Sequence, residues 1–361
     1  MSMPRRGRTS SVGPVHATLI HGEKDIRFEE VPDPILRGDD DAIVRVVASC
    51  VCGSDLWPYR GVIASRGRIG HEFIGIVEQV GSSVARVRVG DFVIAPFYVC
   101  DGTCANCVNG YSTSCLQGSW WGGDDRRGHP ADGGQGELVR VPLADGTLAV
   151  VPGPVDEALV PHLLTLSDVM GTGHHAAVSA GVQPGDTVVV VGDGAVGLCG
   201  VLAASRLGAS RVVAMSRHES RAALAREFGA TDVVAERGDE GVRVIHEMFD
   251  GVGAIRVLEC VGTEEAMSQA HGAARPGGQV GFVGVPHLNP ELPMRPWFNK
   301  NVGLRGGIAP VRGYIEELLP EVLSGALQPG RVFDLELPLS EVAEAYAAMD
   351  ERRAIKVLLR P

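Results

Sequence analysis

Four cysteines lie close together in one turn-rich stretch of the chain. Successive members are separated by three, two and seven residues, and Asp, Gly, Asn and Ser fill much of the space between Cys100, Cys104, Cys107 and Cys115. Four thiolates at this spacing suit a closed tetrahedral zinc site that fastens a loop with little apolar content. Free thiols or two disulfides are the alternatives. Clustering on such a turn-rich loop favours a metal, and because four protein ligands leave no open position on it, its role would be structural.

A second group of potential ligands is spread along the chain. It consists of Cys52 within Cys-Gly-Ser-Asp, His71 followed by Glu72, and Asp168. Thiolate, imidazole and carboxylate groups are all zinc ligands. Taken singly, however, a cysteine after a strand is more often buried packing, and a lone histidine is more often a hydrogen-bonding residue. Spacing alone cannot join residues this far apart.

A glycine-rich turn lies near the middle of the chain. The run from Val188 to Val191 predicts a buried strand, and the apolar stretch 198–207 predicts a close-packed helix. Between them stand Gly192, Asp193, Gly194, Ala195, Val196 and Gly197. In such a turn the first glycine permits the tight bend, the second lets a pyrophosphate approach the backbone, and the third lets helix and strand pack closely. Because the motif follows a strand and opens a helix, it predicts dinucleotide binding.

The end of the following strand, 212–214, predicts which dinucleotide binds. An NAD site places Asp or Glu there to accept a hydrogen bond from the adenosine ribose 2′-hydroxyl. This chain has Ser216 and Arg217 instead, with Arg221 one helical turn further on. A hydroxyl and guanidinium groups would bind a 2′-phosphate, so NADP is our prediction, with NAD possible. Ordinary solvated arginines are the alternative interpretation.

Length and composition define the class of protein that must position these residues. The chain has 361 residues, 45% of them hydrophobic, with 48 glycines, which predicts two α/β domains with many tight turns. The net charge of -11 argues against nucleic acid as the main partner. No apolar run reaches the length of a membrane span, so no membrane partner is expected. Residues 1–15 are expected to form a disordered tail on a cytoplasmic protein.

The element signals change along the chain. Short strands broken by Gly and Pro over 17–94 predict a small, barrel-like β domain. After 152–154 a helical region leads into alternating strand and helix signals up to about 307, which predicts a doubly wound parallel sheet. The chain then shows helix signals at 311–323 and 339–349 and a last strand at 355–359.

Five motifs occur in a set order along the chain. They are Cys52-Gly53-Ser54-Asp55, Gly70-His71-Glu72, the four cysteines, Ser167-Asp168 with Thr172-Gly173-His174-His175, and the turn at Gly192. This order resembles the zinc-dependent alcohol dehydrogenases of the medium-chain dehydrogenase/reductase family, over nearly the whole chain from about Ala17. The resemblance implies a GroES-like, β-barrel-type catalytic domain over 16–160 and 308–361, and a Rossmann domain over 161–307.

By this resemblance, Cys52, His71 and Asp168 hold a catalytic zinc, and Glu72 is the neighbouring carboxylate that can approach the metal. Many members have a cysteine where this chain has Asp168, but an oxygen ligand is acceptable to zinc. Two zinc ions per chain are therefore expected. A zinc with three protein ligands keeps a position open for a substrate oxygen. Ser54 is placed to take the proton of the substrate hydroxyl.

The resemblance also implies residues around the cofactor. Thr172, Val283 and Gly284 are expected to line the nicotinamide. Lys356 is similar to a basic residue near the C-terminus that reaches the pyrophosphate.

The chain departs from the family pattern in two places. Three residues separate Cys100 from Cys104 where the usual pattern has two, so Asp101 could compete with Cys100 for the metal. Trp57 stands where many relatives carry a histidine that ends a proton relay. Trp57 and Tyr59 then become candidate walls of the substrate pocket, with ordinary packing as the alternative.

The expected function is an NADP-dependent zinc oxidoreductase acting on an alcohol, aldehyde or ketone. By resemblance it is expected to be a homodimer or homotetramer. Two alternatives stay open: a polyol or sugar-alcohol dehydrogenase, and a catalytically silent NADPH-binding redox sensor. A zinc-free quinone or enoyl reductase is disfavoured because all ligand positions are filled.

Overall fold

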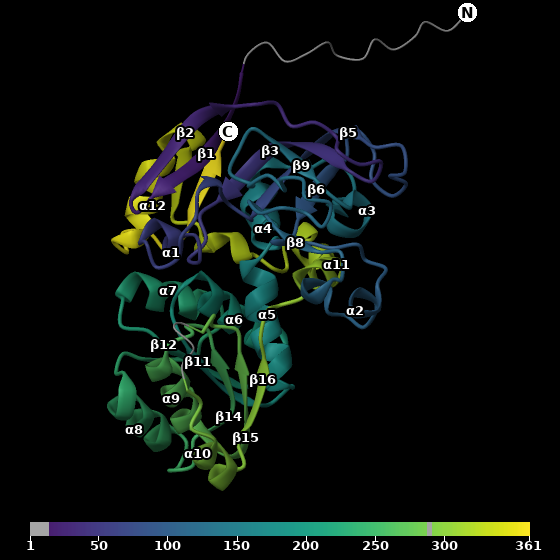
Figure 1. Cartoon of the computed structure of the whole chain (residues 1–361). Coiled ribbons are helices and arrows are strands. Elements are labelled where there is room, and N and C mark those ends of the chain that lie inside the picture. The colour runs from purple at the N-terminus through teal and green to yellow at the C-terminus, as the bar shows by residue number, and fades with distance from the viewer. Residues whose placement is uncertain (1–13, 287–290) are drawn as a thin grey trace, which may run out of the picture.

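The structure of the chain is a computed structural model that describes residues 14–286 and 291–361 (Figure 1). The tail predicted over 1–15 lies almost wholly outside these residues. In Figure 1 a β-rich region forms the upper part of the molecule and a parallel sheet with its helices forms the lower part, with α5 (Val169–Ala180) between them. Among the helices of the described residues, none has the length and apolar character needed to cross a bilayer.

The upper region contains mostly antiparallel strands. Its main sheet has the order β10-β6-β5-β3-β18-β17, with β9 also paired on β3. A three-stranded sheet of order β2-β1-β4 and the two-stranded ribbon β7-β8 complete it. The strands of this region that come before residue 151 are β1 (Val15–Gly22), β2 (Asp25–Val31), β3 (Ala42–Cys50), β4 (Gly67–Arg68), β5 (Phe73–Val80), β6 (Phe92–Ala95), β7 (Tyr98–Val99), β8 (Ser119–Trp120), β9 (Leu138–Val141) and β10 (Ala149–Val150).

The end of the chain completes this upper region. Strand β18 (Val357–Arg360) pairs antiparallel with β3 and parallel with β17 (Leu335–Pro338). In Figure 1 these yellow C-terminal elements lie beside the purple N-terminal strands. Helix α12 (Val342–Asp350) buries Tyr346 in a cluster with Leu56 and Leu359. The first and last parts of the chain thus share one core, while the predicted boundaries at 160 and 308 stay a prediction.

The lower region is built on a parallel six-stranded sheet of order β13-β12-β11-β14-β15-β16. Taken as strands 1 to 6 of the sheet, this is the order 3-2-1-4-5-6 of a dinucleotide-binding fold. Val188–Val191 are buried on both faces, which explains the unbroken β-branched run. The strands are β11 (Thr187–Val191), β12 (Arg211–Met215), β13 (Asp232–Val234), β14 (Ala254–Glu259), β15 (Ala274–Phe282) and β16 (Gly303–Gly306).

Helices cover the parallel sheet and link it to the upper region. A core cluster containing Ile74, Met170 and Leu198 runs continuously from one region into the other through α5. The start of α5, where Asp168 stands, therefore lies at the junction of the two regions. The α-helices are α1 (Leu56–Tyr59), α2 (Ala105–Val108), α3 (Ala144–Thr147), α4 (Val160–Thr165), α5, α6 (Ala195–Arg206), α7 (Glu219–Glu227), α8 (Gly238–Met248), α9 (Glu264–Ala273), α10 (Met294–Lys300), α11 (Val311–Leu323) and α12; short 3-10 turns are η1 (Ser112–Ser114), η2 (Glu157–Leu159), η3 (Pro329–Val332) and η4 (Leu339–Glu341).

Candidate active site

Three separate elements bring the scattered ligands of the sequence together. Cys52 follows β3, His71 and Glu72 directly precede β5, and Asp168 caps the start of α5. One potential ligand atom from each of these four residues lies within 4.8 Å of the others. The Asp168 Oδ2 atom is 3.6 Å from Cys52 Sγ and 3.5 Å from His71 Nε2. The junction of the two regions thus holds a compact cluster of one thiol, one imidazole and two carboxylates.

The charges of this cluster suit a bound cation. Burial, together with the charge of Asp168, raises the pKa of the Cys52 thiol. Burial alone would lower the pKa of His71, but the charges of Asp55 and Cys52 raise it well above its usual value. Burial would also raise the pKa of Asp168, yet its contacts with His71 hold it below that of an ordinary carboxyl group. Without a metal, the negative charges around His71 favour a proton on its imidazole. A divalent cation bound among these groups would supply that positive charge instead.

A buried hydrogen-bonded chain holds His71 from behind. Asp55 Oδ1 lies 3.2 Å from His71 Nδ1, while Asp55 Oδ2 accepts from the Cys52 backbone N–H at 2.9 Å. The Gln135 side chain donates to Asp55 Oδ2 at 3.2 Å and accepts from the Tyr346 hydroxyl at 3.0 Å. Asp55, Gln135 and Tyr346 are all buried. With Nδ1 directed at Asp55, the Nε2 nitrogen of His71 faces the cluster, as a metal-binding imidazole requires.

Sequence reasoning assigned no role to this chain of residues. Asp55 stood within a quoted motif, so its position next to Cys52 was a usable signal. Gln135 and Tyr346 carried none, because only the folded chain brings α12 and the segment before β9 to the same place.

Two further contacts fix the carboxylates of the cluster. The Thr172 hydroxyl donates to Asp168 Oδ1 at 2.7 Å. The Lys356 ammonium donates to Glu72 Oε1 at 2.6 Å and to the Val51 carbonyl at 3.3 Å, and both Lys356 and Glu72 are fully buried. Thr172 and Lys356 were predicted to contact the cofactor; in this structure their polar atoms bind the carboxylates of the cluster.

Phe97 borders the cluster, and the residues predicted to line the substrate pocket lie in the turn and helix after Cys52. Ser54 is half-buried in the turn after Cys52, and Trp57 is half-buried on α1. Tyr59 is buried and packs against Tyr346 with ring centroids 5.3 Å apart. These contacts support ordinary packing, the alternative to a place in the wall of the substrate pocket. Phe97 meets His71 edge to face at 6.4 Å. Sequence reasoning missed Phe97.

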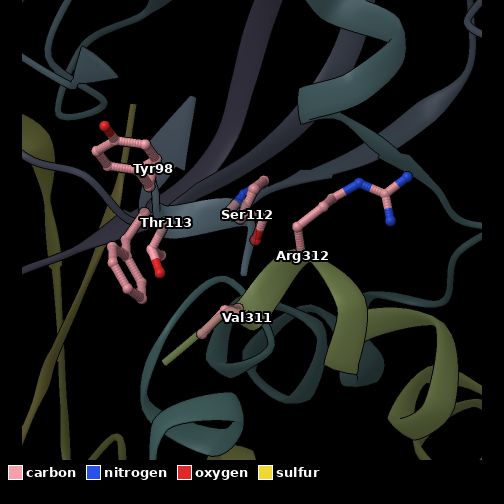
Figure 2. Close-up of a pocket in the computed structure, with 7 residues that line it drawn as sticks. Tyr98, Ser112, Thr113, Val311 and Arg312 are labelled. Carbon is pink, nitrogen blue, oxygen red and sulfur yellow. The ribbon is translucent and has the colours of Figure 1, made fainter. Parts of the chain in front are cut away.

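A small pocket opens behind Phe97 at the base of the cysteine-rich loop (Figure 2). Figure 2 shows Tyr98, Ser112 and Thr113 on one side and Val311 and Arg312, at the start of α11, on the other. It encloses a free volume of about 0 Å³, whereas ligand sites typically offer about 300 Å³ or more. We therefore assign it no substrate.

The cysteine-rich loop gathers a second candidate metal site, and its membership differs in one place from the four cysteines. Ligand atoms of Asp101, Cys104, Cys107 and Cys115 lie within 4.8 Å of one another. Backbone N–H groups also point at the sulphurs: that of Asp101 lies 3.2 Å from Cys115 Sγ, and that of Leu116 lies 3.4 Å from Cys104 Sγ. Such N–H groups suit thiolates better than thiols.

Cys100 stands apart from this group. Its Sγ donates to the Gly146 carbonyl at 3.4 Å in a fully buried position, and burial raises the pKa of the thiol to about 12. Asp101, by contrast, turns its carboxylate into the loop, where Oδ1 accepts from the N–H groups of Thr103 and Cys104. The extra residue between Cys100 and Cys104 thus brings the carboxylate, rather than the first sulphur, to the group.

The glycine turn has the geometry that a pyrophosphate requires. Gly192 has φ +116°, which favours glycine, and a Cβ on Gly197 would lie 2.0 Å from the Gly192 carbonyl oxygen. A Cβ on Gly194 would instead meet nothing within 4 Å. Helix α6 begins at Ala195 and includes Val196, three residues earlier than the apolar pattern predicted, because Gly194 serves as its N-cap. Open space therefore lies beside the free N–H groups of this helix, where phosphates bind.

Residues from the neighbouring strands complete this edge of the sheet. A Cβ on Gly284 would lie 2.1 Å from the Gly262 nitrogen, so the segments after β14 and β15 touch, and Val283 is buried there. After β12, Ser216 is buried and Arg217 is exposed. Ser216 and Arg221 both contact Asp193.

Comparison with known proteins agrees with this arrangement. Residues 38–154 match the alcohol dehydrogenase GroES-like domain, and residues 195–324 match the zinc-binding dehydrogenase domain. A probable zinc-binding alcohol dehydrogenase of Mycobacterium tuberculosis is 34% identical over 352 residues, which cover 96% of this chain and 89% of the relative. The structure of an alcohol dehydrogenase from Thermus sp. ATN1 superposes with a TM-score of 0.87 at 32% identity, over 96% of this chain and 99% of that one. A putative zinc-binding dehydrogenase from Sinorhizobium meliloti bound to NADP gives a TM-score of 0.80 at 26% identity, over 97% and 100%.

The two matched domains confirm the predicted fold, a GroES-like catalytic domain with a Rossmann-type parallel sheet. The relatives identify the chain as an alcohol dehydrogenase-type oxidoreductase. Its own geometry supplies two candidate metal sites. The chain therefore belongs to the zinc-binding alcohol dehydrogenases of the medium-chain dehydrogenase/reductase family.

Proposed function

We propose that this protein transfers a hydride between NADP(H) and a small alcohol, aldehyde or ketone, with Cys52, His71 and Asp168 as the ligands of a catalytic zinc. The observation that carries the proposal is that these three residues, from three distant parts of the chain, bring their ligand atoms within 4.8 Å of one another. They lie at the junction of the two regions, and the glycine turn that would bind the cofactor joins β11 to α6 in the parallel-sheet region. A polyol dehydrogenase would use the same centre, since substrate shape is decided by loops around it.

The bound groups supply the chemistry that the side chains lack: zinc acts as a Lewis acid for the substrate oxygen, and the nicotinamide carries the hydride. The chain's own residues orient and neutralise. Asp55 holds the proton of His71 on Nδ1, and Thr172 fixes one oxygen of Asp168. Lys356 neutralises Glu72, so that this second carboxylate stays close to the centre without adding a net charge. Ser54, which follows Cys52 closely in the sequence, is the group proposed to take a proton from the substrate hydroxyl.

The cysteine-rich loop is proposed to hold a structural zinc. Cys104, Cys107 and Cys115 supply three thiolates, and Asp101 is the fourth ligand that the geometry favours. Cys100 is the alternative that the family pattern suggests.

The cofactor assignment is also a proposal. Arg217 and Arg221 would favour the 2′-phosphate of NADP, and the relative from Sinorhizobium meliloti was solved with that dinucleotide. NAD(H) is the alternative, which the carboxylate of Asp193 supports. Assembly as a homodimer or homotetramer and a cytoplasmic location stay predictions from the sequence.

Replacement of Cys52 by serine tests the proposal. We expect the purified Cys52→Ser protein to fold, to contain one zinc instead of two, and to lose alcohol oxidation followed as NAD(P)H absorbance. Cys199→Ala, which removes a buried thiol on α6, is the matched control and should keep both metals and turnover. Undiminished turnover in Cys52→Ser would refute the proposed centre. Dinucleotide binding without turnover by the wild-type protein, across a panel of alcohols, aldehydes and polyols, would favour the redox-sensor alternative.

A further inference from the structure

Asp193, between the first two glycines of the turn, has contacts that the motif does not require. Its side chain is buried. Oδ2 accepts a hydrogen bond from the Ser216 hydroxyl at 2.8 Å, and Oδ1 lies 3.4 Å from Arg221 Nη1. Asp193 thus engages two of the three residues from which the sequence predicted a site for a 2′-phosphate.

The position of Asp193 follows from the sheet. Strands β11 and β12 are parallel neighbours, with Val191 paired to Met215, so the residues after them lie side by side. NAD-binding folds place an acidic residue after the second of these strands, where it accepts a hydrogen bond from the ribose 2′-hydroxyl. In this chain Ser216 occupies that place, and the carboxylate of Asp193 reaches it from the first strand instead.

The position of the Asp193 carboxylate favours one of the two possible cofactors and disfavours the other. A ribose 2′-hydroxyl can donate a hydrogen bond to the Asp193 carboxylate. A 2′-phosphate carries up to two negative charges and would have to share Ser216 and Arg221 with that carboxylate. Arg217, which is exposed after β12, contributes the opposite preference.

We propose that Asp193 is the residue that discriminates between the two dinucleotides, by accepting the 2′-hydroxyl of NAD and opposing the 2′-phosphate of NADP. Because of it, the wild-type protein binds NAD(H) as well as NADP(H). The inference rests on the proposed function, since it requires dinucleotide binding at this turn. It goes further by assigning cofactor choice to a residue outside the strand-end position that normally decides it.

Asp193→Asn is the direct test, because the amide oxygen of asparagine can still accept from Ser216 while the charge is lost. Dissociation constants of NADH and NADPH are measured by nicotinamide fluorescence on the zinc-loaded full chain. We expect wild type to bind both, and Asp193→Asn to favour NADPH over NADH by about tenfold more than wild type, the effect of one charge-assisted hydrogen bond. An unchanged ratio of the two constants overturns the inference.

Two further variants make the test specific. Glu219→Gln removes an acid at the start of α7 whose side chain is 90% exposed, and it should leave the ratio unchanged. If it matches Asp193→Asn, the effect comes from net charge and the inference is wrong. Arg221→Gln leaves Asp193 without its cation and should weaken NADPH while sparing NADH, which keeps the inference testable if Asp193→Asn does not fold. Equal weakening of both cofactors would contradict it.

Failure of the inference can be told from failure of the proposed function. If wild type binds neither dinucleotide, the proposed function falls and the inference falls with it. If wild type binds both and oxidises alcohols, but the ratio is indifferent to Asp193, only the inference falls.

Discussion

Replacing Asp55 with asparagine should weaken metal binding at the proposed catalytic site, because it changes which nitrogen of His71 carries the proton. Asp55 Oδ2 accepts two hydrogen bonds, from the Cys52 backbone and from Gln135. The oxygen of an asparagine is therefore held at that side, and its NH₂ group takes the place of Oδ1, 3.2 Å from His71 Nδ1. Facing a donor, Nδ1 must become the acceptor, and the ring proton moves to Nε2. The nitrogen that faces Asp168 then has no lone pair for a metal.

The expected loss is about 10- to 100-fold in zinc affinity at this site, the usual effect of removing the partner of a metal-binding histidine. This corresponds to about 1.4–2.7 kcal/mol. Zinc is measured by competition with a chelator of known affinity, with the metal of the cysteine-rich loop as an internal standard. Tyr346→Phe removes only the far end of the chain of hydrogen bonds and should cost much less than Asp55→Asn. Equal zinc affinity in wild type and Asp55→Asn, within twofold, would refute the reasoning.

Three other predictions follow from the same structure. Asp101→Asn should release the zinc of the cysteine-rich loop, while Cys100→Ser should retain two zincs per chain by metal analysis; loss of zinc from Cys100→Ser alone would restore the four-cysteine site. His175 has its pKa lowered from 6.5 to about 4, chiefly by burial. Because the unfolded chain protonates this histidine more readily than the folded one, the free energy of unfolding is unaffected above pH 6.5 and falls as the pH drops toward 4. The loss is about 2 kcal/mol at pH 5. The melting temperature of His175→Gln should therefore fall less between pH 7 and pH 5 than that of wild type; equal falls would contradict this. Gly194→Val should fold normally, because a side chain there meets open space, yet weaken dinucleotide binding at least about tenfold. Gly197→Ala should instead lower the melting temperature, since its Cβ would strike the Gly192 carbonyl. Normal cofactor affinity in Gly194→Val would show that the phosphates lie elsewhere.

The sequence was most informative where a signal is local. The β-branched run at Val188–Val191 predicted a buried strand, and the glycines after it predicted a helix. Both were found, although α6 begins three residues earlier than the apolar pattern indicated. The cysteine-rich loop was recognisable as a candidate metal site because its potential ligands are neighbours in the chain. Even there, the choice between Cys100 and Asp101 required the backbone path, since a single inserted residue decides which side chain faces inward.

Contacts between distant segments could not be predicted in the same way. Cys52, His71 and Asp168 were joined only by resemblance to a family, and their meeting depends on β3, β5 and α5 packing at one junction. Gln135 and Tyr346 carry no local signal, and the position of Asp193 in the glycine turn did not indicate its contacts with Ser216 and Arg221. Each acts through a partner at least 23 residues away, so its role exists only in the folded chain.

The pairing of β18 with β3 affects how the protein is made. Residues 357–360 pair both with β17 and with β3, a strand synthesised some 300 residues earlier, and Tyr346 and Lys356 lie in the same late segment of the chain. The parallel sheet has all its strands once residue 306 has left the ribosome. The cluster around Cys52, by contrast, has all its contacts only after Tyr346 and Lys356 have been made. A nascent chain stalled before that point would leave the end of β3, at Ser49 and Cys50, without its partner β18, and such an edge can pair with another unfinished copy. A chain that stops before Tyr346 would thus have every strand of the parallel sheet but would lack the side chains that contact Gln135 and Glu72.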